Sequence, residues 1–398
     1  MKLRAVLGAV LVASVSPATA AEWSFDPRLA AAYLYNDNNR LTDVPGAEID
    51  VSGAELNAEI AIRAETPRSL FQLTPRLRST FFPDDEQEEA DDRFVKMLAR
   101  HATERAVALL DVNYSSVVTL GDYYPGSAVK NDDTLGDPDR GVSVGQSGRN
   151  RQDRLVFTPQ FSFDVTERQR LELDIEYLDV TYDEQVQGDR EDFQDLAFAV
   201  GYRFALSETA SVAVRGGFAT FDPADADSTD AQGLNVEWRN EISDTAEAYV
   251  RVGANRVETI ANNGGSNWDT GFAGGAGMRW AFEVTDIWLD AESYLDPNST
   301  GVIVNRNQAR AQLSRRLGPL TRVMLGARVI SDTGTGDAQD SFTDRVYAAG
   351  NLGIEWRIAR KWTLVGSYDY SWREYDNAVT DAASNSFRIG VVWEPNRR

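Results

Sequence analysis

The sequence predicts an all-β chain that forms a transmembrane, antiparallel, up-and-down β-barrel of about eighteen strands. Three observations predict it: runs of about ten residues that alternate between apolar and polar, short turn-like segments that recur along the chain, and aromatic residues at the ends of the runs. In one such run Leu352, Ile354 and Trp356 alternate with Gly353 and Glu355. A wall with one apolar and one charged face fits lipid outside and water inside.

The chain begins with the features of a secretory signal peptide, which we expect over residues 1–20. Lys2 and Arg4 precede an apolar run, and Ala18 and Ala20 are small residues suited to a cleavage site. The sequence contains no cysteine, which excludes a disulfide framework and thiol catalysis. Because no linker of biased composition interrupts residues 21–398, we predict one barrel domain there.

Short turns divide the alternating runs into pairs. We expect these turns at 66–68, 103–105, 166–168, 207–209, 243–245, 284–286, 318–320 and 360–361. The runs predict strands near 23–35, 51–65, 70–82, 92–101, 106–118, 152–165, 170–182, 192–205, 210–221, 231–242, 246–259, 268–282, 287–295, 302–316, 321–330, 345–358, 362–375 and 384–394. The count falls to sixteen if the two weakest runs, 92–101 and 302–316, are not strands. Short turns that alternate with longer loops place both termini on the short-turn side, as in bacterial outer-membrane barrels.

The repeat excludes other all-β architectures. A propeller blade fits four short strands into a similar period, whereas each unit here carries two longer strands. A mean hydropathy of −0.39, with no apolar run of membrane-spanning length after the N-terminus, excludes a helical membrane protein.

Aromatic residues at both ends of the runs predict two interfacial girdles, because an apolar ring with a polar tip suits the headgroup boundary. The predicted short-turn girdle comprises Tyr202, Phe204, Trp280, Trp288, Trp356 and Trp362, and the predicted long-loop girdle comprises Tyr35, Tyr182, Phe221, Trp268, Tyr294 and Tyr375.

The net charge of −22 would repel nucleic acid, so we expect no nucleic-acid partner. Much of the imbalance lies in predicted loops, and residues 83–92 hold seven acids and no base. Such loops either attract cations or keep a surface solvated, and we favour solvation. The spacing lacks the glycine-turned ligands of an EF-hand, and we predict no metal site and no cofactor.

The polar face of each run supplies the candidate pore lining, a mixture of acids and arginines. Unpaired ions in a dry interior are costly, so this lining needs water or cross-strand partners. A barrel of this strand number is wide enough for an aqueous channel, although the same charges could also pair into a closed plug. The candidate lining residues are Glu55, Glu59, Arg63, Arg76, Arg78, Glu172, Asp174, Glu176, Arg203, Arg215, Glu237, Arg239, Arg251, Arg279, Asp290, Glu292, Arg310, Arg328, Glu355, Arg357, Asp369 and Arg373.

Two further segments have unusual composition. The longest predicted loop, 119–150, contains the pair Tyr123 and Tyr124 and is a candidate constriction, by analogy with the third loop of general porins. Residues 271–280 carry glycine on both faces of the run, which predicts a bulge or a thin wall beside a loop.

We predict that the protein is not an enzyme. The sequence has one histidine, His101, which lies beside a short turn, and no Ser-His-Asp arrangement can be assembled around it. Pairs such as Asp174 and Glu176 fit the alternation of a wall strand better than a catalytic dyad.

The chain resembles uncharacterised outer-membrane porin-like barrels of the β-barrel porin 2 type, found beside exopolysaccharide and protein-sorting genes in Gram-negative bacteria. The resemblance is carried by LRSTFFPDDEQEEADD and by the hairpins FTPQFSFDVTERQRLELDIEYLDVTYDE and YRFALSETASVAVRGGFATFD. It implies a porin-like barrel with a link to envelope polysaccharide, and it assigns no functional residue. Unlike such barrels, which end on an aromatic residue, this chain continues past Trp393.

The sequence therefore predicts an outer-membrane channel for small hydrophilic solutes or ions, with periplasmic termini and with outer-membrane lipid and lipopolysaccharide as its surroundings. Export of exopolysaccharide with envelope machinery, and a closed structural barrel without transport, are the alternatives. Neither the solute nor the oligomeric state follows from the sequence.

Overall fold

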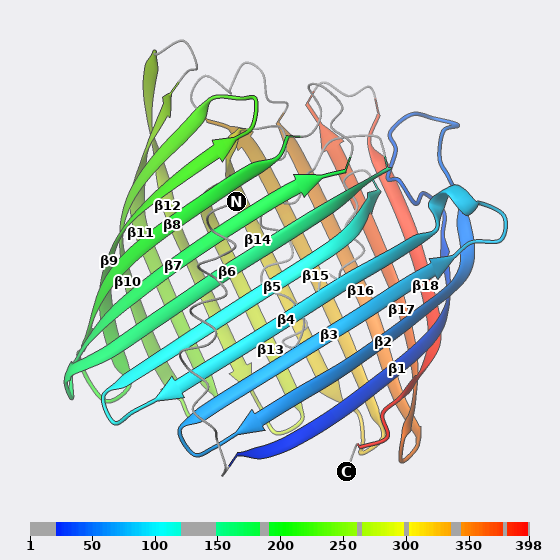
Figure 1. The fold of residues 1–398 in the computed structure, drawn as a ribbon, viewed down its shortest axis with the longest axis horizontal. Coiled ribbons are helices and arrows are strands. Elements are labelled where there is room, and N and C mark those ends of the chain that lie inside the picture. Colours follow the sequence, from blue (N-terminus) through cyan, green and yellow to red (C-terminus); the bar gives the residue numbers. More distant parts are fainter. Residues whose placement is uncertain are drawn as a thin grey trace.

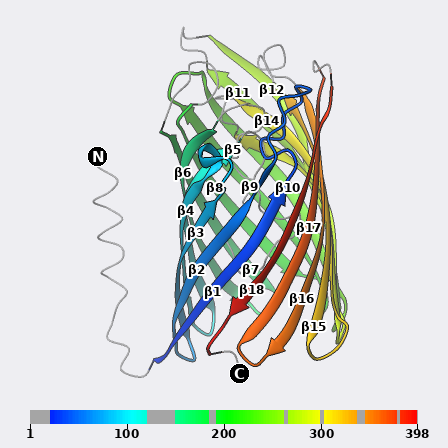
Figure 2. The same cartoon turned by 90° about the vertical axis from the view of Figure 1, so that its right-hand side faces the viewer.

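The computed structural model describes residues 21–120, 149–183, 191–260, 265–297, 302–335, 344–376 and 380–396. These residues form one antiparallel sheet of eighteen strands, in which each strand pairs with the next along the chain (Figure 1). The sheet closes into a barrel because β1 pairs with β18 as well as with β2 (Figure 2). The predicted fold class and strand number are confirmed.

The strand bounds follow the predicted runs closely. The two weakest runs are strands β4 and β14, so sixteen strands is excluded. The strands are β1 (Glu22–Asn36), β2 (Val51–Glu65), β3 (Ser69–Phe81), β4 (Ala90–Ala102), β5 (Ala106–Leu120), β6 (Arg149–Thr166), β7 (Gln169–Tyr182), β8 (Phe193–Ala205), β9 (Ala210–Pro223), β10 (Ser228–Ser243), β11 (Ala246–Ile260), β12 (Ser266–Ala281), β13 (Thr285–Pro297), β14 (Ile303–Arg316), β15 (Thr321–Gly334), β16 (Arg345–Ala359), β17 (Trp362–Tyr375) and β18 (Ala382–Trp393), and a 3-10 turn, η1 (Glu86–Glu88), precedes β4.

Hydroxyl side chains close several of the short turns. The Thr66 Oγ1 accepts a hydrogen bond from the Ser69 backbone N–H at 2.9 Å, and Thr103 Oγ1 accepts one from Ala106 N–H at 3.0 Å. These bonds satisfy backbone donors that the ladder leaves free at the turn. Glu22, the first residue of β1, pairs with Glu65, and Trp393, the last residue of β18, pairs with Trp362. The first and the last strand therefore both reach the short-turn end of the barrel.

The outer face of the barrel is apolar. Leu56, Leu234 and Phe272 are 57–60% exposed, and exposed apolar side chains recur at every second position along most strands. Such a belt around a closed sheet suits hydrocarbon, because the backbone groups of the paired strands bond to one another within the sheet. Of the helices in the described ranges, none has the length and apolar character needed to cross a membrane.

The aromatic girdles are only partly as predicted. At the short-turn end, Tyr202, Phe204, Trp280, Trp356 and Trp362 lie on the outer face, but Trp288 alternates with the exposed Leu289 and lies on the inner face. At the long-loop end, Tyr35 and Trp268 face outward, whereas Tyr182, Phe221, Tyr294 and Tyr375 lie on the inner face. The prediction was wrong for these residues because it rested on their position at the end of a run. Whether a residue occupies an odd or an even position in its strand decides which face it lies on.

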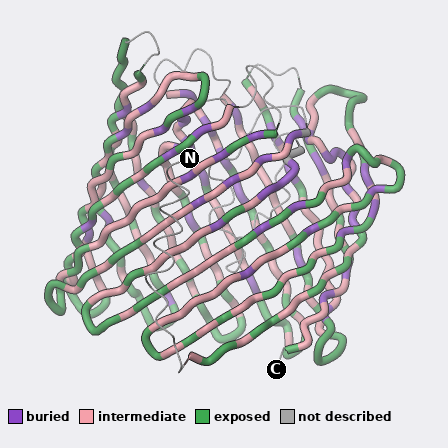
Figure 3. The backbone as a smooth tube through the Cα atoms, in the orientation of Figure 1, coloured by how far each residue is buried: buried purple, intermediate pink, exposed green. Residues whose placement is uncertain are grey.

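The ladder between β12 and β13 stops early at the long-loop end. Pairing runs only from Ala281–Asp286 to Gly274–Ser293, although β12 continues to Ser266 and β13 to Pro297. Residues 266–270 are exposed on both faces, whereas the upper ends of β13 and β14 are buried. Buried residues gather toward this end of the barrel (Figure 3).

Candidate functional site: the barrel interior

The interior of the barrel carries the candidate lining residues. In β2, Glu55 and Glu59 alternate with the exposed Leu56 and Ile60, and the same alternation puts the other candidate residues on the face opposite the apolar belt. Whether they line a conducting pore stays a prediction.

One ion cluster spans four neighbouring strands. Arg203 on β8 bonds Glu172 on β7 at 2.7 Å and Glu237 on β10 at 3.1 Å. Arg215 on β9 lies 2.9 Å from the same Glu172, although β8 separates the two strands. The two ends of this bridge face Gly201 on β8, where a Cβ would lie only 3.3 Å from Arg215 Nε and from Glu172 Oε2. The missing side chain lets the two charges meet.

A second cluster spans β11 to β14. Tyr249 faces Gly277 on β12, which in turn faces Asp290 on β13, and the Tyr249 hydroxyl donates to Asp290 across the glycine. A Cβ on Gly277 would lie 2.3 Å from the Tyr249 ring. Asp290 also accepts a 2.8 Å bond from Arg310, whose guanidinium lies 4.9 Å from the centroid of the Trp288 ring.

Two of the glycines at 271–280, Gly275 and Gly277, are explained by these inner contacts. The predicted bulge is wrong, because both ladders of β12 run without a register shift. The wall is instead thin beneath side chains of the neighbouring strands: Gly277 accommodates Tyr249, and Gly275 lies between Arg251 and Glu292, which are 3.5 Å apart.

A third bridge closes the seam between the first and last strands. Arg388 on β18 lies 3.2 Å from Glu55 on β2, and the bridge crosses β1 diagonally, because Arg388 faces Leu34 and Glu55 faces Ala32. Nearby, Arg78 and Asp92 form a buried pair at 2.6 Å. Arg388 and Asp92 were not among the predicted lining residues.

The other candidate lining residues are more scattered. Arg63 pairs with Glu65 near a short turn, Arg328 donates to Gln308, and Arg373 lies over the Tyr375 ring. The same inner face also carries Glu59, Arg76, Asp174, Glu176, Arg239, Arg251, Arg279, Glu292, Glu355, Arg357 and Asp369.

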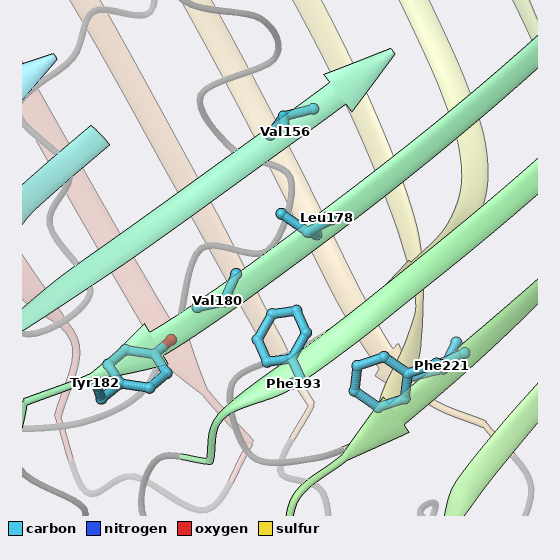
Figure 4. Packing of buried hydrophobic residues seen from close by; sticks show 7 residues of the cluster. Val156, Leu178, Val180, Tyr182, Phe193 and Phe221 are labelled. Carbon is cyan, nitrogen blue, oxygen red and sulfur yellow. The ribbon is translucent and has the colours of Figure 1, made fainter. Parts of the chain in front are cut away.

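Near the long loops the interior becomes apolar. Leu178 and Val180 of β7 are fully buried and contact a cluster with Val156, Tyr182, Phe193, Phe221 and Ile303 (Figure 4). Leu295 packs against this apolar cluster. The cluster joins β6–β9 to β13 and β14, which are not their ladder neighbours. Side chains therefore meet across the lumen at this mouth.

On β13 to β16, buried ion pairs join the strands at the same mouth. Arg306 on β14 binds both carboxylate oxygens of Asp332 at 2.8 Å, and Asp332 also accepts a 3.0 Å bond from Arg345. Arg306 pairs with Asp296 as well, and all four side chains are at most 2% exposed. We call these four residues the ion row.

The loop after β1 also folds over the mouth. Leu41 is fully buried against Ala382 and Tyr347, and its backbone has a φ of 48°, a left-handed conformation that costs about 1–2 kcal/mol for a non-glycine residue. Glu88, in the acidic segment 83–92, accepts hydrogen bonds from Asn39 and Arg40 and is fully buried. The expectation that this segment is solvated is therefore wrong for Glu88 and for Asp92.

The sequence contains a signal for the apolar mouth that the alternation analysis missed. In β7 the apolar residues occupy odd positions up to Tyr177 and then even positions from Leu178. The pairing of β7 with β8 continues through this point without a register shift. A change of phase without a bulge means that apolar residues have moved to the inner face.

Two other predictions concern Tyr123 with Tyr124 and His101. Tyr123 and Tyr124 lie outside the described residues. His101 is exposed on β4 at the short-turn end, with its Nδ1 2.9 Å from Ser69 Oγ. No group of three or more His, Cys, Asp or Glu side chains in the described ranges could hold a metal ion.

Comparison with known proteins gives similarity of architecture only. No protein-family model and no curated protein matches the chain. Solved structures that resemble it are OprD of Pseudomonas aeruginosa (13% identity, TM-score 0.46, covering 94% of this chain and 93% of that chain), a BenF-like porin of Pseudomonas fluorescens Pf-5 (7%, 0.48, 94% and 99%) and OccK2 (OpdF) of Pseudomonas aeruginosa in complex with glucuronate (10%, 0.47, 94% and 98%). At these values the likeness assigns neither a family nor a solute, and the barrel rests on its own strand pairing.

Proposed function

We propose that the protein is an outer-membrane channel through which small hydrophilic solutes or ions diffuse. The observation that carries the proposal is the solvent exposure of charged side chains on the inner face of the barrel. The side chains of Arg215, Asp174 and Arg388 all lie on the inner face, and they remain 32%, 30% and 37% exposed. A charged lining whose side chains stay partly exposed supports a wet lumen, because ions left unpaired in a dry interior would be costly.

The location follows from the wall and from the N-terminal sequence. The apolar outer face belongs in a bilayer, and the signal peptide expected at 1–20 directs the chain to export. In this arrangement the short turns and both termini lie in the periplasm, and the long loops face outward. Lipid and lipopolysaccharide then surround the belt.

The direct test is conductance of the purified full chain in planar bilayers. We expect discrete current steps of constant size with a modest cation preference at low salt, which high salt should screen. Reversing one inner charge with Arg215→Glu should increase the cation preference, whereas the outward Val214→Gln should leave it unchanged. If folded protein inserted into the bilayer carries no current, the channel proposal is wrong.

A closed structural barrel is the second candidate. The apolar cluster, the ion row and the packing of Leu41 all narrow the same mouth. Absence of current from wild type and from variants that loosen this mouth would favour it.

Polysaccharide export stays a prediction from the family resemblance, and the mixed charge of the described lining does not favour conduction of an acidic polymer.

A further inference from the structure

The upper end of β13 and β14 is paired with a neighbouring strand of the barrel on one side only. We define the β13–β14 end as residues 294–297 and 303–308. On the β12 side the ladder stops at Gly274–Ser293, so the described edge above this pair has no strand partner. On the β15 side pairing continues from Val304–Gly334 downward.

The apolar contacts of the β13–β14 end come from an unexpected face. Ile303 and Leu295 have the same parity as Leu289, which is 41% exposed on the outer wall. Ile303 is nevertheless only 6% exposed and belongs to the apolar cluster on the inner face of β6–β9. The β13–β14 end has therefore left the cylindrical wall and reaches across the mouth.

The ion row fixes the opposite side of this end. Arg306 within the end binds Asp332 on β15, and Asp332 binds Arg345 on β16. Buried, bidentate ion pairs are directional and resist displacement. The apolar contact is non-directional, and it can form and separate without leaving buried polar groups unsatisfied. The end is thus hinged at the ion row and rests on the apolar cluster.

We propose that the β13–β14 end is a gate of the channel mouth. In the closed state Leu295 and Ile303 pack on Leu178, Val180, Phe193 and Phe221, and in the open state they separate from them. The ion row stays intact in both states and serves as the pivot. This gate rests on the proposed channel function.

The first experiment changes the contact between the β13–β14 end and the apolar cluster. It uses the full chain in planar bilayers. Ile303→Asp places an unpaired carboxylate in the apolar cluster and should raise the open fraction on the order of tenfold or more. The matched control is Val392→Asp on β18, because Val392 is 3% exposed, lies on the inner face opposite Thr363 and is outside the cluster. Its open fraction should equal that of wild type. Heat-dependent mobility in gels verifies that each variant is folded.

The second experiment fixes the gate. Since the chain has no cysteine, Phe221→Cys with Ile303→Cys can be joined by a short bismaleimide in the folded protein. We expect efficient joining and loss of current, while each single-cysteine variant treated with the same reagent keeps the current of its untreated form. Failure to join, or an unchanged current after joining, would overturn the gate.

The outcomes separate the gate from the channel. An equal, steady current in wild type, Ile303→Asp and the joined variant overturns the gate and leaves the channel standing. Current that is rare in wild type, frequent in Ile303→Asp and absent in the joined form supports both. Silence of all folded variants overturns the channel, and the gate with it.

Discussion

Single small residues decide which charges meet inside this barrel. Gly201 lies between Glu172 and Arg215, and Gly275 lies between Arg251 and Glu292. In each case a side chain reaches its partner over the intervening strand, because nothing projects from the position between them. A mixed lining can therefore be satisfied across three strands and not only between adjacent ones.

Filling one such position should break the contact above it. In Gly277→Ala the new Cβ would meet the Tyr249 ring at 2.3 Å, so the ring must move and its hydrogen bond to Asp290 is lost. We expect the free energy of unfolding in lipid vesicles to fall by about 1–3 kcal/mol. Gly271→Ala is the matched control on the same strand, since nothing lies within 4 Å of its Cβ. Equal stability of both variants would contradict the cluster.

The two faces of β16 should respond oppositely to the same added charge. Leu352→Arg puts a guanidinium in hydrocarbon and should cost about 2–4 kcal/mol if the residue lies near the bilayer midplane. Asn351→Arg places it on the inner face, opposite Asp369, and should be tolerated. Urea unfolding of both variants in vesicles measures the difference. A similar loss at the two positions would contradict the assignment of faces.

At the scale of the elements, the strands could be predicted and their upper ends could not. Period-two alternation and hydroxyl-closed turns are local, so the bounds of β2 and β17 agree with the predicted runs. The inward course of β13 and β14 depends on contacts with β6–β9, far away in the sequence. The one local sign of these contacts in the sequence is the change of phase within β7, where the apolar residues move from odd to even positions after Tyr177.

The ion row should be the least replaceable polar element of the described wall. Arg306→Met removes one partner and leaves Asp296 and Asp332 buried, which should cost about 3–5 kcal/mol of unfolding free energy. Arg63→Met, which breaks the exposed pair with Glu65, should cost less than about 1 kcal/mol. Chemical denaturation of the two variants in parallel gives the comparison, and a loss in Arg306→Met as small as that in Arg63→Met would show that the row is not a structural pivot.

At the scale of the whole molecule, the candidate site was predicted as a face and not as a set of contacts. Alternation assigns Glu172 and Arg203 to the interior, but it does not predict the ion pair between them. The pair depends on the register between two strands, which the sequence of one strand does not determine. The same limit applies to Arg388, whose partner is on β2, near the other end of the chain. Closure of the barrel creates the Arg388–Glu55 pair, because it brings β18 beside β1 and β2.

The two-faced wall around a wet lumen is the central claim, and labelling tests it most directly. Single cysteines at 351–356, introduced into a chain that has none, would be treated with a water-soluble maleimide in lipid vesicles. We expect labelling at Asn351, Gly353 and Glu355, and protection at Leu352, Ile354 and Trp356. Labelling without this alternation, or protection at all six positions, would contradict the account.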